Sequence, residues 1–151
     1  MFAAVAAAFA LASPAFAPGA TIPRAFTCDG RNVSPLLRWT APPAGTRSFA
    51  LLVDDPDAPI GNFTHWLGWN IKAKARSLRV GQRAPVEGTN GAGRIGYIGP
   101  CPPSGRHRYI FRLYALKAPL ELARGASRAQ FLSALRGKVL ATARLVGTYA
   151  R

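Results

Sequence analysis

The sequence has few acidic residues and lacks the motifs of several common enzyme classes. Only 6 of its 151 residues are Asp or Glu, against 20 Lys and Arg, which gives a formal net charge of +14. It contains no GxSxG elbow, no HExxH motif, no P-loop and no GxGxxG that follows a predicted strand and opens a helix. The basic residues never form a run of four, so the pattern is not that of a nucleic-acid-binding arm, and nucleic acid is not expected as a partner.

The length predicts a single domain spanning residues 1–151, with residues 1–8 as a disordered extension or the remnant of a signal-like segment. No apolar run approaches the ~18 residues of a transmembrane segment. The apolar start and Ala15-Phe16-Ala17 are typical of a signal peptide, but no basic residue precedes Arg24. We therefore expect a cytoplasmic protein, with a periplasmic or secreted location as the alternative.

Short apolar runs separated by Gly and Pro predict a fold rich in short strands. Period-2 alternation is clearest around Tyr109, where that residue shares a face with Phe111 and Leu113. One helix is expected after Ser127, which can form a capping box, with Phe131, Leu132 and Leu135 as its apolar stripe and Gly137 as its end. The four strands predicted with most support are 48–53, 64–71, 108–116 and 139–149. The expected fold class is therefore all-β, a sandwich or a barrel.

Three of the six carboxylates lie within four residues, at Asp54, Asp55 and Asp57, and Pro56 and Pro59 accompany them. Like charges this close repel one another, so the cluster requires a structural or chemical reason. One interpretation is a turn, because Asp and Pro are turn formers. The other is a rigid loop that points one carboxylate into a cleft, and the two are compatible.

The chain has two histidines, His65 and His107, and each opens a predicted strand. The Pro-rich and Gly-rich loop from Gly99 to Gly105 directly precedes His107 and Tyr109, and it resembles the rim of a binding site. A protonated histidine near a carboxylate can donate a hydrogen bond to a phosphate. These residues predict an anion-binding pocket.

The same residues also permit other arrangements. Asp55, His65 and His107 could bind a metal as two histidines and one carboxylate, although their spacing does not support it. Ser104, His107 and Asp55 could form a catalytic triad, although nothing in the sequence positions the serine. Cys28 and Cys101 could pair in an oxidising compartment or remain reduced.

Several stretches together resemble the phosphatidylethanolamine-binding protein family, in particular its bacterial branch of Raf kinase inhibitor-like proteins of the YbhB/YbcL type. Two stretches resemble the family signatures, 55–59 followed by His65-Trp66, and 99–109. The opening and ending of the bacterial branch are matched by 13–16, 22–23, 27–30, 34–35 and 137–149. Because 13–16 match that opening, cleavage after Ala17 would remove part of the domain, and Ala8 to Leu11 is the expected first strand.

The resemblance implies a two-sheet antiparallel β-sandwich of Greek-key type with one or two short helices. It also implies a phosphate-like or phospholipid head-group ligand, a binding or regulatory role without catalysis, and no cofactor or metal. The alternatives are a basic interaction protein with acidic partners and a small hydrolase that uses Asp55 and His107. Whether the chain forms a homodimer stays open. Carried over by position, the ligand-binding residues would be Asp55, Asp57, His65, Pro102, Pro103, His107 and Tyr109.

Overall fold

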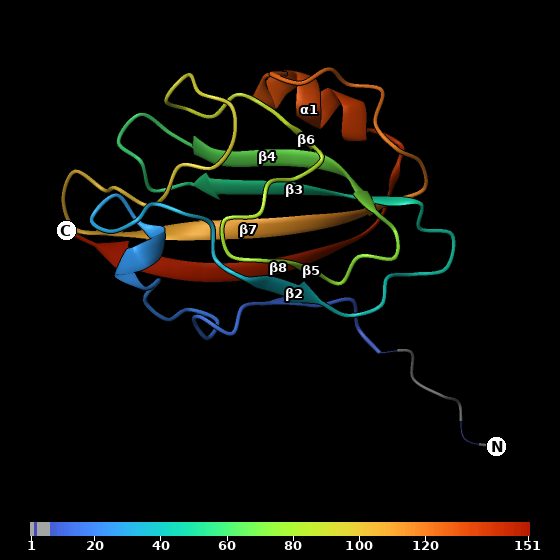
Figure 1. Ribbon diagram of the computed structural model, residues 1–151, viewed down its shortest axis with the longest axis horizontal. Helices are drawn as coiled ribbons and strands as arrows, with labels where there is room; N and C mark the ends of the chain where they lie inside the picture. The colour runs from blue at the N-terminus through green and yellow to red at the C-terminus, as the bar shows by residue number, and fades with distance from the viewer. Residues whose placement is uncertain (1, 3–6) are drawn as a thin grey trace.

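The computed structural model describes residue 2 and residues 7–151, and it contains two antiparallel sheets (Figure 1). The three-stranded sheet has the order β1-β2-β5 and the five-stranded sheet the order β6-β4-β3-β7-β8. This arrangement confirms the predicted all-β sandwich class. The strands are β1 (Leu11–Ala12), β2 (Leu37–Trp39), β3 (Ser48–Asp55), β4 (Phe63–Lys72), β5 (Ser77–Leu78), β6 (Val86–Glu87), β7 (Arg106–Leu116) and β8 (Val139–Ala150).

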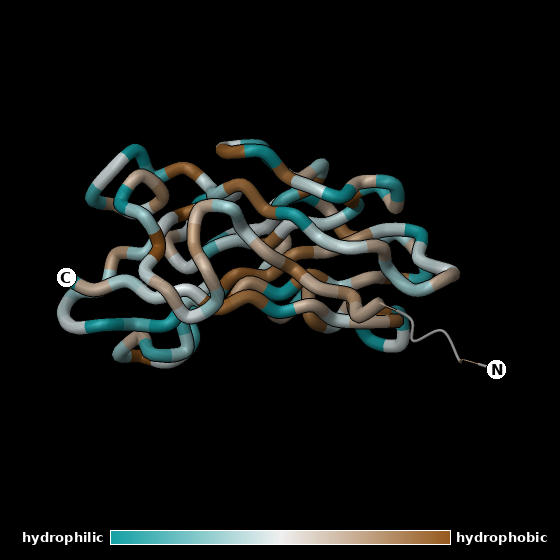
Figure 2. The backbone as a smooth tube through the Cα atoms, turned by 90° about the horizontal axis from the view of Figure 1, so that it is seen from below, coloured by the Kyte–Doolittle hydropathy of each residue, from teal (hydrophilic) through white to brown (hydrophobic). Residues whose placement is uncertain are grey.

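The central strand β3 is buried on both faces, which explains why its sequence reads as a continuous apolar run. Phe49, Leu51 and Val53 belong to the core between the two sheets, whereas Ala50 and Leu52 belong to a second core on the opposite face. Hydrophobic stretches accordingly run through the middle of the molecule (Figure 2). Each fully buried aliphatic side chain of this kind contributes about 1.5–3 kcal/mol.

The helix α1 (Arg128–Leu135) covers the second core, above β4 and β6 in Figure 1. The predicted capping box is present, because Ser127 accepts from the Gln130 backbone and the Gln130 side chain accepts from the Ser127 backbone. Phe131 and Leu135 are buried, but Leu132 is 38% exposed, so its assignment to the apolar stripe was wrong. Successive helical residues point about 100° apart, and Leu132 therefore turns away from the face that Phe131 occupies.

The first strand is shorter than expected and begins later, at Leu11 instead of Ala8. The Ala8 carbonyl and the Ala10 backbone instead form hydrogen bonds with Thr40. Residues 1 and 3–6, part of the expected N-terminal extension, lie outside the described residues. Within the described part of the chain, no helix has the length and apolarity needed to cross a membrane.

The loops that carry the predicted site gather at one end of the sandwich, on the left of Figure 1. They are the connection between β3 and β4, the segment that leads into β7, and the region of the short 3-10 helix η1 (Arg24–Phe26). The C-terminus lies at the same end. In the antiparallel order β4-β3-β7, the end of β3 lies beside the starts of β4 and β7, so residues far apart in sequence meet here.

Candidate functional site

A cavity of about 360 Å³ opens at this end of the sandwich. Asp55 is the last residue of β3, His65 the third of β4, and His107 and Tyr109 the second and fourth of β7. These four side chains line the cavity together with Pro102 and Pro103. Six of the seven predicted site residues therefore meet at one cavity, and Asp57 is the exception.

Asp55 and His107 form the most tightly coupled pair of the cavity. The Nδ1 atom of His107 lies 2.6 Å from Oδ2 of Asp55, and the two residues are 8% and 3% exposed. The other carboxylate oxygen, Oδ1, accepts a hydrogen bond of 2.8 Å from the Asp57 backbone. Because the carboxylate holds Nδ1–H, Nε2 is the histidine atom left for another partner. Protonation of the ring makes this Nε2–H a charged donor.

The three clustered aspartates have separate partners, which removes the repulsion expected from the sequence. Asp54 binds two arginines on the α1 side of the sheet, and Asp55 binds His107 on the side facing the cavity. Asp57 is exposed and binds Arg108 through two side-chain hydrogen bonds and one backbone hydrogen bond, all of 2.9 Å. These bonds from Arg108 lower the pKa of the Asp57 carboxyl to about 2. Asp57 therefore ties the β3–β4 loop to β7 and is not a lining residue.

His65 occupies a β-bulge that turns it toward the cavity. The pairing of β3 with β4 passes from Val53 opposite Trp66 to Asp54 opposite Thr64, so His65 lies at the shift in register. Its Nδ1 lies 2.6 Å from the Ile98 carbonyl oxygen. Since a carbonyl can only accept, Nδ1 carries the hydrogen and Nε2 of the neutral ring is an acceptor. Burial lowers the pKa of His65 below the usual histidine range, which favours this neutral form.

Tyr109 places a hydroxyl without a partner at the same site. Its ring packs edge-on against His65, with ring centroids 5.2 Å apart, and Phe63 packs on His65 at 4.9 Å. The Tyr109 hydroxyl is buried and forms no hydrogen bond with the other described residues. Burial also raises its pKa above the usual tyrosine value, so the hydroxyl keeps its proton.

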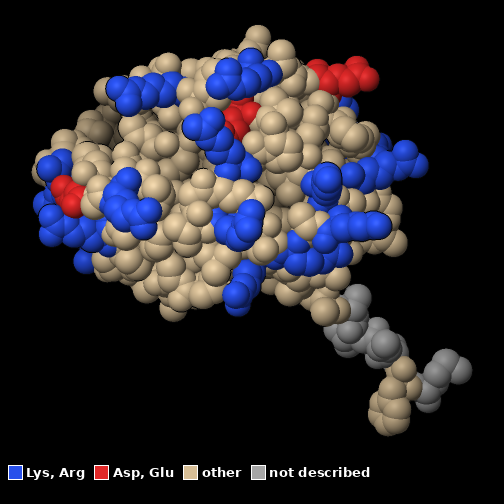
Figure 3. Space-filling model, viewed as in Figure 1, with Lys and Arg blue, Asp and Glu red and all other residues tan. Residues whose placement is uncertain are grey.

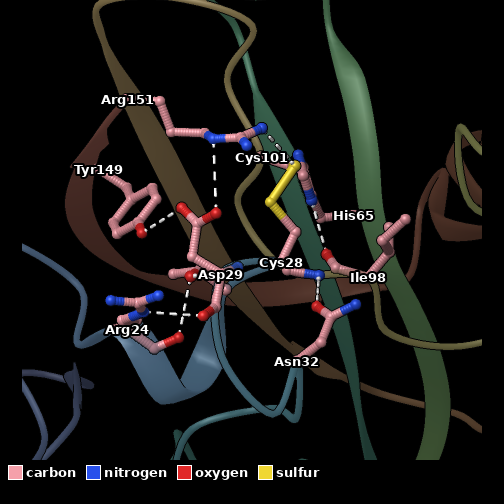
Figure 4. The surroundings of a disulfide bond; sticks show 11 residues. Arg24, Cys28, Asp29, Asn32, His65, Ile98, Cys101, Tyr149 and Arg151 are labelled. Atoms are coloured by element: carbon pink, nitrogen blue, oxygen red, sulfur yellow. Dashed lines mark hydrogen bonds and ion pairs between the residues drawn. A yellow bond between two sulfur atoms is a disulfide. The ribbon is translucent and has the colours of Figure 1, made fainter.

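A disulfide fixes a loop that contributes to the lining of the cavity (Figure 4). Cys28, just after η1, bonds to Cys101, which lines the cavity. This settles the question of pairing that the sequence left open. The Cys28 backbone also donates to the Pro100 carbonyl, and Asn32 accepts from the Gly99 backbone. A Cβ at Gly99 would lie 2.3 Å from a backbone oxygen, so only glycine permits this close approach.

Part of the lining was not predicted. Phe63 stands two residues before His65, and the period of a strand could have placed it on the same side. For the other unpredicted lining residues, the sequence offers no comparable pattern, because they come from irregular segments. They are Ala58, Pro59, Ile60 and Ile98, whereas Gly99 and Cys101 belong to the loop that was expected to form the rim.

Neither the metal site nor the catalytic triad considered from the sequence is formed among the described residues. Ser104 does not line the cavity and forms no hydrogen bond with His107 among these residues. Asp55 is committed to His107 and the Asp57 backbone, and no group of three His, Cys, Asp or Glu side chains among residues 2 and 7–151 could hold a metal ion.

Comparison with known proteins finds solved structures with the same fold and identifies the family of the chain. The structure of CT736 from Chlamydia trachomatis matches with a TM-score of 0.92 and 39% identity, over 95% of this chain and 98% of that one. E. coli YbcL, described as a member of the mammalian PEBP family, matches with a TM-score of 0.89 and 32% identity, over 96% and 99%. A UPF0098 protein of Methanothermobacter thermautotrophicus is 47% identical, over 93% of this chain and 98% of its own length.

The high TM-scores show that these solved structures share the two-sheet fold of this chain. The family model described as phosphatidylethanolamine-binding protein matches residues 12–150. The chain belongs to the phosphatidylethanolamine-binding protein family, in the UPF0098 and YbhB/YbcL branch, as its sequence motifs indicated.

Proposed function

We propose that the protein binds a small phosphate-like anion in the end cavity and does not transform it. The observation that carries this proposal is the buried Asp55–His107 pair, whose Nδ1–Oδ2 distance is 2.6 Å. The Asp55 carboxylate holds Nδ1–H of His107 and leaves Nε2 for a ligand. In the complex, a protonated Nε2 would donate a charge-assisted hydrogen bond to the anion.

In the complex, a protonated His107 would balance the negative charge of Asp55, whose two oxygens already accept hydrogen bonds. Tyr109 adds a second donor, and neutral His65 adds an acceptor. A ligand that carries both acceptor oxygens and one hydroxyl or ammonium donor matches this set. Phosphate monoesters such as phosphoethanolamine, and the phosphodiester head groups of phospholipids, have that chemistry.

The size and walls of the cavity support a small ligand with an apolar part. Its volume of about 360 Å³ lies near the lower end of the ~300–1,000 Å³ range of small-molecule sites. Phe63, Ile60 and the two prolines present apolar surface beside the polar groups. Exclusion of water by such walls strengthens the hydrogen bonds to an anion.

Binding without turnover is favoured over hydrolysis by the composition of the lining. An Asp–His pair can act as a general base, but a hydrolase that forms a covalent intermediate also needs a nucleophilic side chain within its reach. Among the described residues, no Ser, Thr or Lys side chain lines the cavity, and Cys101 is in a disulfide. Recovery of the ligand unchanged after long incubation is therefore expected.

The test is calorimetry with phosphoethanolamine and with inorganic phosphate at about 0.15 M salt, where the Debye length is about 8 Å. We expect His107→Ala to weaken binding by about 1.5–3 kcal/mol, the range for a hydrogen bond to a charged group. Arg47→Ala is the matched control. Arg47 is exposed, and its backbone bonds to Leu116, at the other end of the sandwich.

Equal affinity of wild type and His107→Ala would contradict the proposal. If binding instead falls steeply with salt in all three proteins, the basic surface and not the cavity holds the anion. Release of phosphate from phosphoethanolamine would establish the hydrolase alternative.

A further inference from the structure

Two smaller cavities, of about 180 and 140 Å³, lie beside β6. They share Arg83, Glu87 and Ile95 as lining residues, so they adjoin one another. None of the residues that line the end cavity lines either of them. They are therefore a separate feature of the molecule.

Glu87 is the unusual group in these cavities. It is only 8% exposed, and its Oε2 accepts a hydrogen bond of 2.6 Å from the Trp66 indole and a longer one from the Ala84 backbone. Its Oε1 accepts none from the other described residues and is not sealed from the cavity space. No Lys or Arg side chain among residues 2 and 7–151 lies within 4.0 Å of the carboxylate.

A buried carboxylate without a counter-ion destabilises the fold, because it has lost its hydration. A ligand that donates a hydrogen bond to the carboxylate offsets this desolvation free energy. Arg83 lines both cavities and Arg124 lines the smaller one, yet neither is paired with Glu87. Asn32, Ser34 and Gln82 add polar side chains to the larger cavity. The site therefore combines one unpaired negative charge with a nearby positive charge.

We propose that these cavities bind a small zwitterion of the amino-acid class, with its ammonium group on Glu87 and its carboxylate on Arg83. A simple organic cation would have to approach a chain of net charge +14, whereas a zwitterion carries no net charge. Among the charged side chains on the face shown in Figure 3, basic ones predominate over acidic ones. The proposal is independent of the function of the end cavity.

The volume limits the ligand to a few heavy atoms. At ~30 Å³ for each water molecule in the liquid, the larger cavity has the volume of about six waters. This is well below the ~300–1,000 Å³ of typical sites for drug-sized molecules. A free amino acid fits this limit, and a nucleotide does not.

The indole N–H of Trp66 is a reporter inside the site, because it bonds directly to Glu87. The indole of Trp69 bonds to the Leu122 carbonyl and that of Trp39 has no partner among the described residues, so both serve as internal controls. In ¹⁵N NMR spectra we titrate L-alanine, ethylamine and propionate. Ethylamine is alanine without its carboxylate, and propionate is alanine without its ammonium group. Alanine should shift the Trp66 indole resonance saturably, ethylamine more weakly, and propionate not at all.

Substitutions at Glu87 and Arg83 test whether alanine binds at these two residues. Glu87→Gln keeps an acceptor for Trp66 and should weaken alanine binding at least tenfold, whereas Glu121→Gln, the same change at the exposed second glutamate, should not. Arg83→Gln, at an exposed position, should weaken alanine binding but not ethylamine binding, and it carries the test if Glu87→Gln does not fold. The proposal is overturned if the Trp66 indole does not respond to alanine at millimolar concentrations, or if a folded Glu87→Gln variant or Arg83→Gln binds alanine as the wild type does.

Discussion

Asp54 and Asp55 are adjacent in sequence, but their carboxylates lie on opposite faces of the five-stranded sheet. Asp54 bonds to Arg112 at 3.1 Å and to Arg128 of α1 at 2.7 Å. Asp55 bonds to His107 at the cavity. Alternation of side chains along β3 is the cause, because successive residues of a strand point to opposite faces. One aspartate thus fastens the helix to the sheet and the other belongs to the site.

This division predicts opposite effects of the same substitution at the two positions. Asp54→Asn should lower the free energy of unfolding by about 1.5–3 kcal/mol, since charged hydrogen bonds to two arginines are weakened, and should leave phosphate binding intact. Asp55→Asn should weaken phosphate binding, because His107 loses the carboxylate that holds its Nδ1–H. Urea denaturation and calorimetry on both variants measure the two effects. Loss of binding in Asp54→Asn at unchanged stability would contradict the assignment.

The partnerless hydroxyl of Tyr109 predicts a substitution that improves stability and harms binding. Tyr109→Phe removes a buried polar group that has no hydrogen bond among the described residues, so stability should rise by about 1 kcal/mol. Phosphate binding should weaken by about 0.5–1.5 kcal/mol, the contribution of one hydrogen bond. Thermal melting and calorimetry provide the readouts. A destabilised variant that binds normally would mean that the hydroxyl serves the fold.

The long strands could be predicted because their sequences carry a local pattern, whereas the full set of candidate site residues came from the resemblance to the family signatures. Tyr109, Phe111 and Leu113 share the inter-sheet core, as their period-2 spacing indicated. The same period places His107 on that face, next to the cavity. The capping box at Ser127 likewise needs only four residues to be recognised. These features depend on residues that lie close together in the chain, so the sequence alone is enough to recognise them.

Other features depend on long-range contacts that leave no local pattern. Strands β1, β2, β5 and β6 have only two or three residues each, too few to show a period. The bulge at His65 arises from the pairing of β4 with β3, and the partner of Cys28 lies 73 residues away. Glu87 belongs to no recognisable motif. Its hydrogen-bond partner Trp66 lies 21 residues earlier, on the neighbouring strand β4. Such features require the tertiary structure.

The lowered pKa of His65 predicts that stability falls in weakly acidic solution. Below about pH 6.5, the ordinary pKa of histidine, the unfolded chain binds a proton at this residue that the folded protein excludes, so unfolding is favoured as the pH falls. The slope from this residue is at most about 1.4 kcal/mol per pH unit and ends at the folded-state pKa. His65→Asn can still donate to Ile98 but does not titrate. Urea denaturation from pH 7 to 4.5 should show a shallower slope in this variant.

An unchanged slope in His65→Asn would contradict burial of a neutral His65. Asp57 does not interfere with the comparison, because its pKa is lowered from 3.8 to about 2. The stability that its pairing with Arg108 provides is complete above about pH 4 and is lost only as the pH falls through 2. The two groups therefore act in separate pH ranges.

The Cys28–Cys101 disulfide also bears on the location of the protein. Thiols are kept reduced in most cytosols, and structural disulfides are typical of oxidising compartments. The cytoplasmic location expected from the sequence stays a prediction, and the disulfide favours its periplasmic or secreted alternative.

Breaking the disulfide should weaken both the fold and the cavity. The bond closes a loop of 73 residues and should contribute about 2–4 kcal/mol, mainly by restricting the unfolded chain. Replacing both cysteines by alanine should lower stability by that amount and weaken phosphate binding, since Cys101 lines the cavity and anchors the 99–105 loop. Denaturation with and without dithiothreitol provides the control, because only the wild type should respond to the reductant. If the wild type is insensitive to the reductant and carries two reactive thiols, the wall of the cavity is held by the Cys28–Pro100 and Asn32–Gly99 hydrogen bonds alone.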